Sequence, residues 1–384
     1  MTEKLYYRDG ECREFTARVL SCSERGGAWE AVLDRSAVFP GGGGQEADSG
    51  TVAGMDILSV REEDETIYFT LPAPLEPGAE VSCSVDWAAR FPRMQGHSGE
   101  HIFSGTVHRL FDGENVGFHM GAEDMTLDFS VELSAEDIAR CELEANRAVW
   151  ADIEIKSLLP SPAELDSMEF RSKKELAGRV RIVEIPGVDM CACCAPHLRR
   201  TGEIGLIKVL DSMRHRGGTR LTLVCGERAY SDYAALHAVN AGISAALSAK
   251  RLETGDAVAR VLREADERHA EITRLRREIL ALKSAAIPET EGNLCLFEPY
   301  MDAVTLRELV NAGVEKCSGI CAAFSGAEGD YRYIIGSRTA DLRALSREIN
   351  AAINGRGGGS PVMIQGTSRA SRAEIEAYFA ARGD

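Results

Sequence analysis

The sequence has no run of about 18 apolar residues, the length that a membrane-spanning helix needs, so no membrane span is expected. Residues 1–15 carry charges where a secretory signal peptide needs an apolar centre. We therefore expect a cytoplasmic protein, whose eleven cysteines are reduced thiols or metal ligands rather than disulfides. The sequence also lacks a glycine loop ending in Gly-Lys-Ser or Gly-Lys-Thr, which excludes a P-loop.

Positive charge is also scarce, because the formal net charge is −16. The excess of negative charge argues against a nucleic-acid partner, because the phosphate backbone of a nucleic acid is also negatively charged. The distribution is uneven, however. Residues 1–90 hold 8 Lys and Arg against 17 Asp and Glu, whereas residues 171–228 hold 12 against 6. The basic segment is either a local phosphate-binding patch or a solvated surface, and charge alone favours the second.

A chain of 384 residues is long for one domain, and the pattern of its segments predicts an α+β multidomain protein. Short alternating stretches in residues 1–90 predict a small β-barrel or sandwich. Residues 91–230 mix helical and strand patterns and predict an α+β domain. Apolar residues at three- and four-residue spacing predict a helical spacer over 231–288, which is also a candidate dimer seam. Residues 289–384 predict a further α/β domain.

Two pairs of metal-binding residue types stand out, each with a four-residue offset. His97 and His101 lie in a run that reads as helix, where positions i and i+4 share a face. Tetrahedral zinc accepts imidazole and thiolate ligands. Together the pairs supply enough donors for one zinc ion, namely His97, His101, Cys193 and His197. Cys191 and Cys194 are competing thiolates, so either could replace Cys193 as the ligand.

Two glycine-rich stretches are weaker signals. One runs over residues 38–45 and ends in Gly43, Gly44 and Gln45, where glycine permits positive φ or close approach of the backbone. A flexible loop explains the glycines equally well. The other covers residues 354–361 around Arg356, and reads either as a phosphate-cradling loop or as a tight turn.

The paired motifs, with Arg199 to Gly205 directly after His197, resemble the editing domain of alanyl-tRNA synthetases. The glycine-rich stretch ending at Gln45 looks like the motif that precedes that domain. Residues 118–121 and 126–128 look like the free-standing editing proteins of the AlaX group. The last hundred residues, with the Arg356 stretch, look like the synthetase's C-terminal domain. Residues 1–90 are too short for an aminoacylation domain, so the whole is similar to the long form of AlaX.

The resemblance implies zinc-dependent hydrolysis of the aminoacyl ester of mischarged alanine-tRNA, which removes serine and often glycine. It also implies one zinc per chain and a tRNA(Ala) partner. Nucleotide binding and ATP binding are further properties that the resemblance implies. It implies metal ligation by the four residues of the two pairs. The residues expected to contact the amino acid or the tRNA are Gly43, Gly44, Gln45, Phe118, Thr126, Arg199, Arg200 and Arg356. The metal either activates a water molecule or positions the substrate.

Glu100 and His101 are the candidate catalytic residues. Position 100 is more often Gln in the family, and a glutamate facing the metal could be a general base. A carboxylate on the helix surface is the plainer alternative. Two rival functions remain. His97-Ser98-Gly99-Glu100-His101 also fits H-x-x-E-H, the inverted zinc-protease motif. Four protein ligands would also suit a non-catalytic, zinc-stabilised tRNA-binding protein, since catalytic zinc usually keeps an open position.

Overall fold

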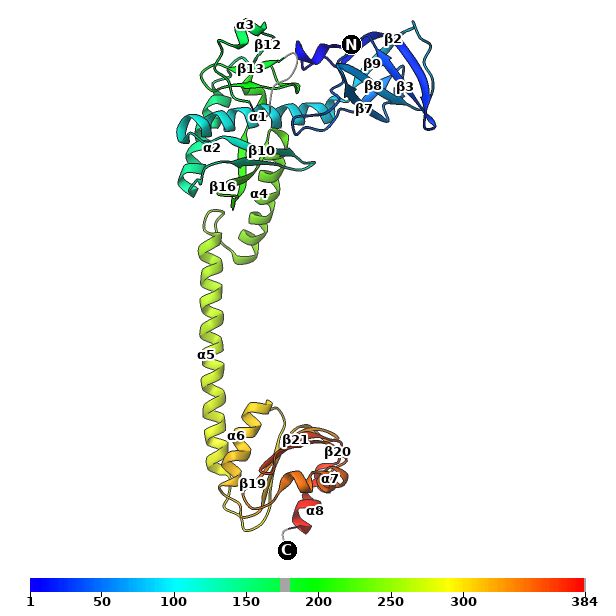
Figure 1. The fold of residues 1–384 in the computed structure, drawn as a ribbon. Helices are drawn as coiled ribbons and strands as arrows, with labels where there is room; N and C mark the ends of the chain where they lie inside the picture. The colour runs from blue at the N-terminus through cyan, green and yellow to red at the C-terminus, as the bar shows by residue number, and fades with distance from the viewer. Residues whose placement is uncertain (173–179, 383–384) are drawn as a thin grey trace. The chain divides into compact units, whose positions relative to one another are not determined.

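The computed structural model describes residues 1–172 and 180–382, so part of the basic segment 171–228 lies outside the described residues. The chain divides into two compact units, Met1–Gly242 and Ile243–Asp384 (Figure 1). Both units combine helices with β-sheets that are mostly antiparallel, and the five-stranded sheet of the second unit also contains one parallel pair, which agrees with the α+β multidomain class expected from the sequence. No helix in the described part of the chain has the length and apolar character needed to cross a membrane.

Seven strands form the N-terminal sheet in the order β6-β5-β9-β2-β3-β8-β7. Their bounds are β2 Glu14–Arg25, β3 Ala28–Leu33, β5 Gly50–Val52, β6 Met55–Asp56, β7 Ser59–Glu63, β8 Thr66–Leu71 and β9 Glu80–Val85. Alternation in β8 buries Ile67, Phe69 and Leu71 in one core. The two-residue β6 and the charged β7 form its edges, so the sheet is an open half-barrel rather than a closed barrel. A short parallel pair, β1 (Glu3–Lys4) with β4 (Arg35–Ser36), lies beside it, with the 3₁₀ helix η1 (Leu5–Tyr7) following β1.

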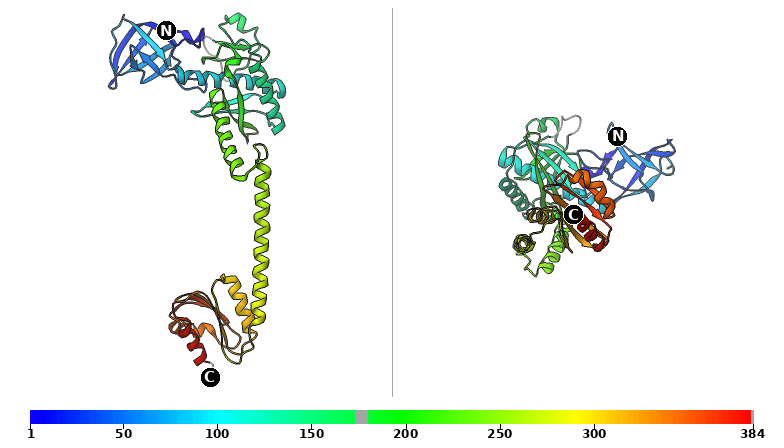
Figure 2. Two further views of the ribbon diagram at one scale, coloured as in Figure 1. Left: turned by 180° about the vertical axis from the view of Figure 1, so that it is seen from behind. Right: turned by 90° about the horizontal axis from the view of Figure 1, so that it is seen from below.

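Helix α1 (Trp87–Phe111) is the central element of the first unit. Figures 1 and 2 show it running between two sheets. One sheet has the order β12-β13-β14, and the other has the order β10-β11-β16-β15. The bounds of these strands are β12 Lys156–Leu158, β13 Ile182–Ile185, β14 Asp189–Ala192, β10 Asn115–Met120, β11 Met125–Phe129, β15 Ile207–His215 and β16 Gly218–Cys225. Helix α2 (Ala135–Trp150) packs beside α1 and begins with a Ser134 capping box. The unit also contains two short helices, α3 (Pro162–Leu165) and η2 (Thr201–Ile204).

Glycines let both sheets approach α1 closely. A Cβ added at Gly99 would lie 2.5 Å from the Cys225 sulfur of β16, and one at Gly105 would lie 2.5 Å from the Val188 carbonyl oxygen. Each glycine costs a helix interior roughly 1 kcal/mol relative to alanine. Because of that cost, a glycine inside a helix is expected to have a packing function. Here Gly99 and Gly105 let β16 and β14 lie against the part of α1 that carries the histidines.

The second unit is built around a five-stranded sheet of order β17-β18-β19-β21-β20. Its strands are β17 Leu294–Glu298, β18 Ile320–Ala327, β19 Asp330–Ser337, β20 Gly355–Gly359 and β21 Met363–Ser368. Helix α6 (Ala303–Val314) and the end of α5 (Thr254–Ala286) cover part of one face. Helices α7 (Leu342–Ala352) and α8 (Arg372–Ala381) pack on the other face.

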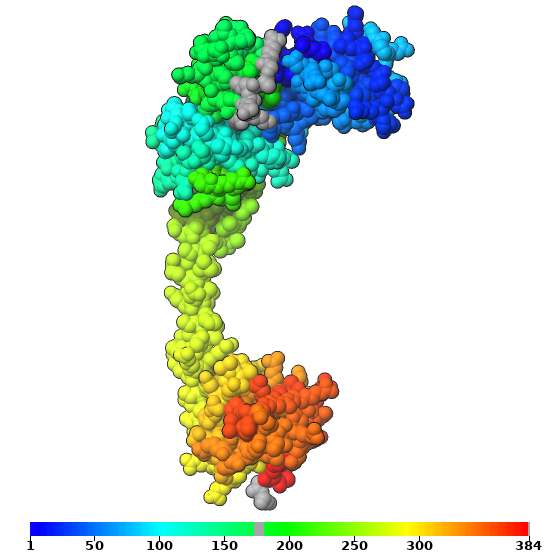
Figure 3. Space-filling model, viewed as in Figure 1, coloured from blue at the N-terminus to red at the C-terminus, as the bar shows by residue number. Residues whose placement is uncertain are grey.

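Two expectations about the second half of the chain are corrected or refined. The segment around Arg356 is not a loop or tight turn, because residues 355–359 form β20, an edge strand paired with β21. The helical segment predicted over 231–288 is two helices, α4 (Glu227–Leu247) and α5. Apolar side chains of α5 such as Val261, Leu275 and Ile279 are exposed, and Figure 3 shows that the rest of the second unit leaves much of the helix uncovered. The predicted four-part domain division stays a prediction.

A buried ion pair joins the glycine-rich segment to α1. Arg90 is fully buried, and its Nε donates to Asp48 Oδ1 at 2.9 Å. Its other N–H groups donate to the carbonyl oxygens of Gly10 and Ala37. Asp48 in turn accepts a hydrogen bond from the Phe39 backbone N–H at 2.7 Å. The pair therefore fixes both ends of residues 39–48 against the start of α1.

We expect Asp48→Ala to lower the free energy of unfolding by about 3 to 5 kcal/mol, because it leaves the Arg90 guanidinium buried without a counter-charge. Thermal unfolding of the purified protein measures this loss. The matched control is Glu144→Ala, which removes the exposed pair with Arg147 and should cost about 1 kcal/mol or less. Equal losses in the two variants would contradict the account.

Candidate metal centre

Four side chains from two distant segments converge in the interior of the first unit. His97 and His101 project from the same face of α1, and Cys193 and His197 lie directly after β14. The Cys193 sulfur lies 3.4 Å from His97 Nε2 and 3.3 Å from His197 Nε2. One ligand atom from each of the four residues lies within 4.8 Å of the other three. The three histidines are buried and Cys193 is half-buried, so the cluster is shielded from bulk water.

Arg181 shapes the segment that carries Cys193 and His197. Its Nη1 donates to the carbonyl oxygens of Cys193 at 3.1 Å and Ala195 at 2.7 Å, and its Nε donates to Ser157 Oγ. The Cys193 N–H donates to the Arg181 carbonyl oxygen at 3.0 Å. Pro196 has no backbone N–H to donate, and the Arg181 guanidinium supplies donors to the carbonyls of this segment. Arg181 is itself buried, and burial lowers the pKa of its guanidinium.

Each histidine has an oxygen partner for its outer ring nitrogen. His97 Nδ1 lies 2.9 Å from Gln45 Oε1, and His101 Nδ1 lies 3.0 Å from Asp189 Oδ2. His197 Nδ1 lies 3.2 Å from Ser98 Oγ. These partners favour the tautomer with a proton on Nδ1, which leaves the lone pair of Nε2 available to a metal. Three oriented imidazoles and one cysteine sulfur are a donor set that fits zinc.

Burial and mutual attraction shift the pKa values of the cluster. Burial lowers the pKa of His101, but hydrogen bonds with Asp189 and Cys193 outweigh burial and raise it to about 9. Burial lowers the pKa of His197 to about 3, against the attraction of Cys193. Burial raises the pKa of the Cys193 thiol, but the nearby His97 and His197 rings outweigh it and hold that pKa well below its usual value. The thiolate that a metal requires is therefore the form that this site favours.

The competing cysteines occupy other positions. Cys191 lies in β14 and groups with His101 and Asp189 rather than with the set of four. Asp189 accepts hydrogen bonds from Arg171 at 2.8 and 2.9 Å, so its carboxylate is already engaged on two sides. Cys194 belongs to neither group and lies beside Gly42 and Gly43. Cys193 is thus the better-placed thiolate.

Glu100 is not the surface carboxylate considered as an alternative, because its side chain is fully buried. Its Oε1 accepts hydrogen bonds from Ser104 Oγ at 2.6 Å and Asn115 Nδ2 at 2.7 Å. Its Oε2 lies 3.9 Å from His101 Nε2, the nitrogen that faces the other ligands. The carboxylate is therefore held at the edge of the cluster by two neutral donors.

The glycine-rich segment docks against the cluster. A Cβ added at Gly44 would lie 2.5 Å from the Phe118 ring, and the positive φ of +88° at Gly44 also favours glycine. The Met120 N–H donates to the Gly44 carbonyl oxygen at 3.1 Å, which ties the segment to β10. The Phe118 ring lies 5.1 Å from the His97 ring, measured between centroids. Gly43, Gly44, Gln45 and Phe118 therefore lie on one side of the four ligands.

Other residues expected at the site lie elsewhere. Thr126 pairs with His119, whereas Phe118 pairs with Leu127 in the core. Thr126 therefore lies on the sheet face opposite α1, and its position does not favour contact with the substrate. Arg199 forms ion pairs with Asp9 and Glu11, and Arg200 forms one with Asp152. Arg356 belongs to the second unit, in β20.

Several residues that support the cluster were not found by sequence reasoning: Ser98, Asp189, Arg171 and Arg181. The only available signal for Ser98 is that it lies between the histidines of α1. Asp189 lies two residues before Cys191, a spacing that could have drawn attention to it. Nothing in the sequence marks Arg171 or Arg181 among the other arginines of the basic segment.

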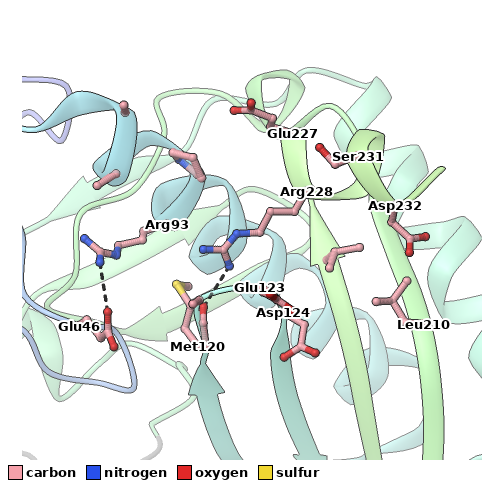
Figure 4. A pocket seen from close by; sticks show the side chains of 16 residues that line it. Glu46, Arg93, Met120, Glu123, Asp124, Leu210, Glu227, Arg228, Ser231 and Asp232 are labelled. Atoms are coloured by element: carbon pink, nitrogen blue, oxygen red, sulfur yellow. Dashed lines mark hydrogen bonds and ion pairs between the residues drawn. The ribbon is translucent and has the colours of Figure 1, made fainter. Parts of the chain in front are cut away.

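A cavity of about 670 Å³ lies beside the glycine-rich segment, between α1, the β10–β11 turn and the start of α4. Figure 4 shows the Arg93 and Arg228 side chains at this cavity. Arg93 is paired with Glu46 at 3.1 Å, and Arg228 donates to the Gly121 carbonyl oxygen at 3.2 Å. Five carboxylates also line it, from Glu46, Glu123, Asp124, Glu227 and Asp232. This excess of negative charge disfavours a phosphate ligand.

Residues 180–222 match a family model described as the threonyl and alanyl tRNA synthetase second additional domain. The alanyl-tRNA editing protein AlaX-L of Pyrococcus horikoshii is 26% identical over 98% of this chain and 96% of its own length. Aarsd1, an alanyl-tRNA editing protein of Rattus norvegicus, is 25% identical over 98% of this chain and 97% of its length. This chain is similar over nearly its whole length to alanyl-tRNA editing proteins. The resemblance predicted from the sequence is therefore confirmed.

The same relationship extends to larger enzymes. The alanine–tRNA ligase of Methanopyrus kandleri is 29% identical over 96% of this chain but only 43% of the ligase. A solved C-Ala domain from Aquifex aeolicus alanyl-tRNA synthetase covers 24% of this chain with 16% identity and a TM-score of 0.21, a score too low to bear on the fold. The expectation of nucleotide and ATP binding finds no support in these relatives or in the described residues.

We expect Asp189→Asn to weaken zinc binding by about 10- to 100-fold, because the amide is a poorer partner for the His101 Nδ1 proton. Competition with a fluorescent chelator measures the dissociation constant. The control is Glu184→Gln on the neighbouring strand β13, where the carboxylate faces Lys156 at 3.8 Å. The account predicts no change in zinc affinity for that variant. Unaltered affinity in Asp189→Asn would show that this carboxylate does not support the site.

Proposed function

We propose that this protein hydrolyses the aminoacyl ester of mischarged alanine-tRNA, acting in trans on Ser-tRNA(Ala) and also on Gly-tRNA(Ala). The observation that supports this best is the buried set of three imidazoles and one cysteine sulfur, in a chain similar over nearly its whole length to alanyl-tRNA editing proteins. Such a protein would act in the cytoplasm, where aminoacyl-tRNA is used.

His97, His101, Cys193 and His197 would hold one zinc ion per chain. When bound, zinc supplies a Lewis acid that stabilises negative charge on the ester oxygen. The chain itself sets the geometry: the Gln45, Asp189 and Ser98 oxygens orient the three imidazoles, as described above. Glu100 is our proposed general base, because its Oε2 lies at the edge of the ligand cluster while Ser104 and Asn115 hold its other oxygen.

Recognition of the amino acid would fall to the glycine-rich side of the cluster. Among the described residues, Gln45 Nε2 is a buried amide nitrogen with no hydrogen-bond partner. An unpaired buried donor is costly, so an acceptor on the substrate would satisfy it. The serine hydroxyl or the ester carbonyl supplies such an acceptor. The Phe118 ring and the Gly43–Gly44 backbone would form the wall of a small pocket, which suits a small amino acid.

The tRNA would be held by other parts of the chain. Arg199 and Arg200 are both exposed, although acidic neighbours occupy their guanidinium groups in the free protein. A phosphate could replace those partners, because exposed ion pairs contribute little stability. We assign the Arg356 strand and its unit to the tRNA body. The exposed apolar residues of α5 make a homodimer through the helical segment part of the same proposal.

One alternative function has an observation in its favour. Four protein ligands can saturate tetrahedral zinc, which suits a structural metal in a non-catalytic tRNA-binding protein. The inverted zinc-protease reading is less well supported, since the motif on α1 gains two further ligands from a second segment.

The deciding experiment measures deacylation of Ser-tRNA(Ala) and Ala-tRNA(Ala) by protein of known zinc content. We expect wild type to remove serine and to spare alanine. His101→Ala should lose both the zinc and the activity. Glu100→Gln should keep the zinc and slow hydrolysis by about 100-fold or more, as loss of a general base does.

His119→Ala is the matched control, because His119 is an exposed histidine on β10 outside the ligand set. It should retain wild-type zinc and activity. Absence of hydrolysis by zinc-loaded wild type that still binds tRNA would overturn the enzyme assignment in favour of the binding protein.

A further inference from the structure

A small cleft of about 50 Å³ lies beside the segment that carries Cys193 and His197. Four stretches of the first unit form its walls, namely residues 8–10, residues 155–157, residues 197–199, and Arg181 with Val183. The first of these stretches touches the ligand segment directly, because a Cβ added at Gly10 would lie 2.5 Å from the His197 carbonyl oxygen. The cleft is therefore bounded by the same backbone that positions one of the candidate metal ligands.

The lining of the cleft is cationic. It contains four basic side chains and one acidic side chain, which are Arg8, Lys156, Arg181, Arg199 and Asp9. The Asp9 carboxylate is already engaged, since both of its oxygens accept from Arg199 Nη2 at 3.0 Å and one also accepts from the Glu11 N–H. Lys156 pairs with Glu184 at 3.8 Å. The charge of the cleft therefore comes mainly from its arginines, and it favours an anion.

Arg181 is the residue that most clearly lacks a partner. Its side chain is buried, and over residues 1–172 and 180–382 it forms no ion pair with a carboxylate. A guanidinium has five N–H donors. Nε and Nη1 donate to Ser157 Oγ and to two backbone carbonyl oxygens, which leaves the N–H groups of Nη2 without an acceptor in those residues. A buried charge with unmet donors is costly, so a ligand in the cleft would relieve that cost.

The protein itself offers Arg181 only an indirect counter-charge. The Cys193 thiolate attracts the guanidinium. Its sulfur, however, contacts the His97 and His197 rings at 3.4 and 3.3 Å rather than the N–H groups of Arg181. The Tyr7 ring lies 5.3 Å from the guanidinium carbon and carries no full charge. An acceptor for Nη2 must therefore come from outside the described chain.

Size and donor geometry select the class of ligand. One water molecule needs about 10 to 15 Å³ of such space, so the cleft admits about four water-sized atoms. The four oxygens of a phosphate or sulfate ion match that number, whereas the sugar and base of a nucleotide exceed it. Guanidinium N–H groups also match the oxygens of an oxyanion in direction, which a spherical chloride ion does not exploit.

We propose that this cleft binds one free tetrahedral oxyanion of phosphate size, which acts as the counter-charge of Arg181. Nη2 of Arg181 donates to the oxygens of the ion, and Arg8 adds positive charge at the exposed side. Because the ion joins residues 8–10 to residues 197–199, its binding stabilises the segment that carries His197. The inference does not depend on the proposed function, since the ion is neither a substrate nor a metal ligand.

The test uses the full chain at fixed metal content, with inorganic phosphate as the probe and chloride to hold the ionic strength constant. Equilibrium dialysis with radiolabelled phosphate should give one ion per chain, and sulfate should compete with it. At a tenfold excess over the dissociation constant, phosphate should raise the midpoint of thermal unfolding by about 3 °C or more, because it binds only the folded state. A midpoint that rises no further in phosphate than in chloride would overturn the proposal.

Two variants locate the ion. Arg181→Gln should abolish phosphate binding, and Arg8→Gln should weaken it about tenfold, as loss of a charge-assisted contact does. Arg8 is exposed, so its variant folds normally and decides the question if Arg181→Gln does not fold. The matched control is Arg35→Gln, an exposed arginine of the same unit outside the lining, which should bind phosphate like wild type. Wild-type binding by both cleft variants would refute the site.

A final measurement separates free phosphate from the phosphate groups of RNA. Excess uncharged tRNA(Ala) transcript is added to protein loaded with radiolabelled phosphate. Retention of the label supports a site for the free ion. Displacement of the label in proportion to bound transcript would show that RNA occupies the cleft, and would overturn the assignment to a free ion. Neither result depends on hydrolysis, so the failure of the deacylase proposal leaves this test intact.

Discussion

The candidate site depends on one constraint: three buried imidazoles must turn their Nε2 atoms toward one another inside the protein. That orientation requires an oxygen partner beside each Nδ1, and the chain provides one from three separate places, the glycine-rich segment, β14 and α1 itself. Cys193 supplies the opposing negative charge. The glycines of α1 admit β14 and β16, and Arg181 fixes the carbonyls of the second ligand segment.

The N-terminal half-barrel supports the site at two places, because residues 39–48 lie against α1 and the core of the half-barrel includes Ala195 of the second ligand segment. Residues 39–48 are held at Asp48 by the buried Arg90 of α1. That anchor places Gln45 against His97 and Gly44 against Phe118. The half-barrel is therefore better understood as a support for one wall of the site than as an independent binding domain.

Much of this could be predicted from local sequence. The spacing of His97 and His101, and of Cys193 and His197, indicated the metal cluster because a four-residue offset already fixes a shared direction on a helix or tight turn. Features such as the Ser134 capping box of α2 and the start of α7 at Leu342 are likewise local, because capping and amphipathic periodicity depend on residues close together in the chain. Thr126 was assigned to the site on resemblance alone, and strand register decides its face. Asp189 and Arg171 could not be found, because their function depends on pairing between β13 and β14 and on contact with α1. The Arg356 strand was misread because its glycines have no side-chain alternation to reveal a strand.

X-ray absorption at the zinc edge of the purified protein tests the central claim most directly. A single zinc per chain is expected, with one sulfur ligand at about 2.3 Å and three nitrogen ligands at about 2.0 to 2.1 Å. Two sulfur ligands would place Cys191 or Cys194 in the coordination sphere and contradict the assignment of the four residues. A protein purified with no bound zinc, and unable to bind it on titration, would contradict the metal centre altogether.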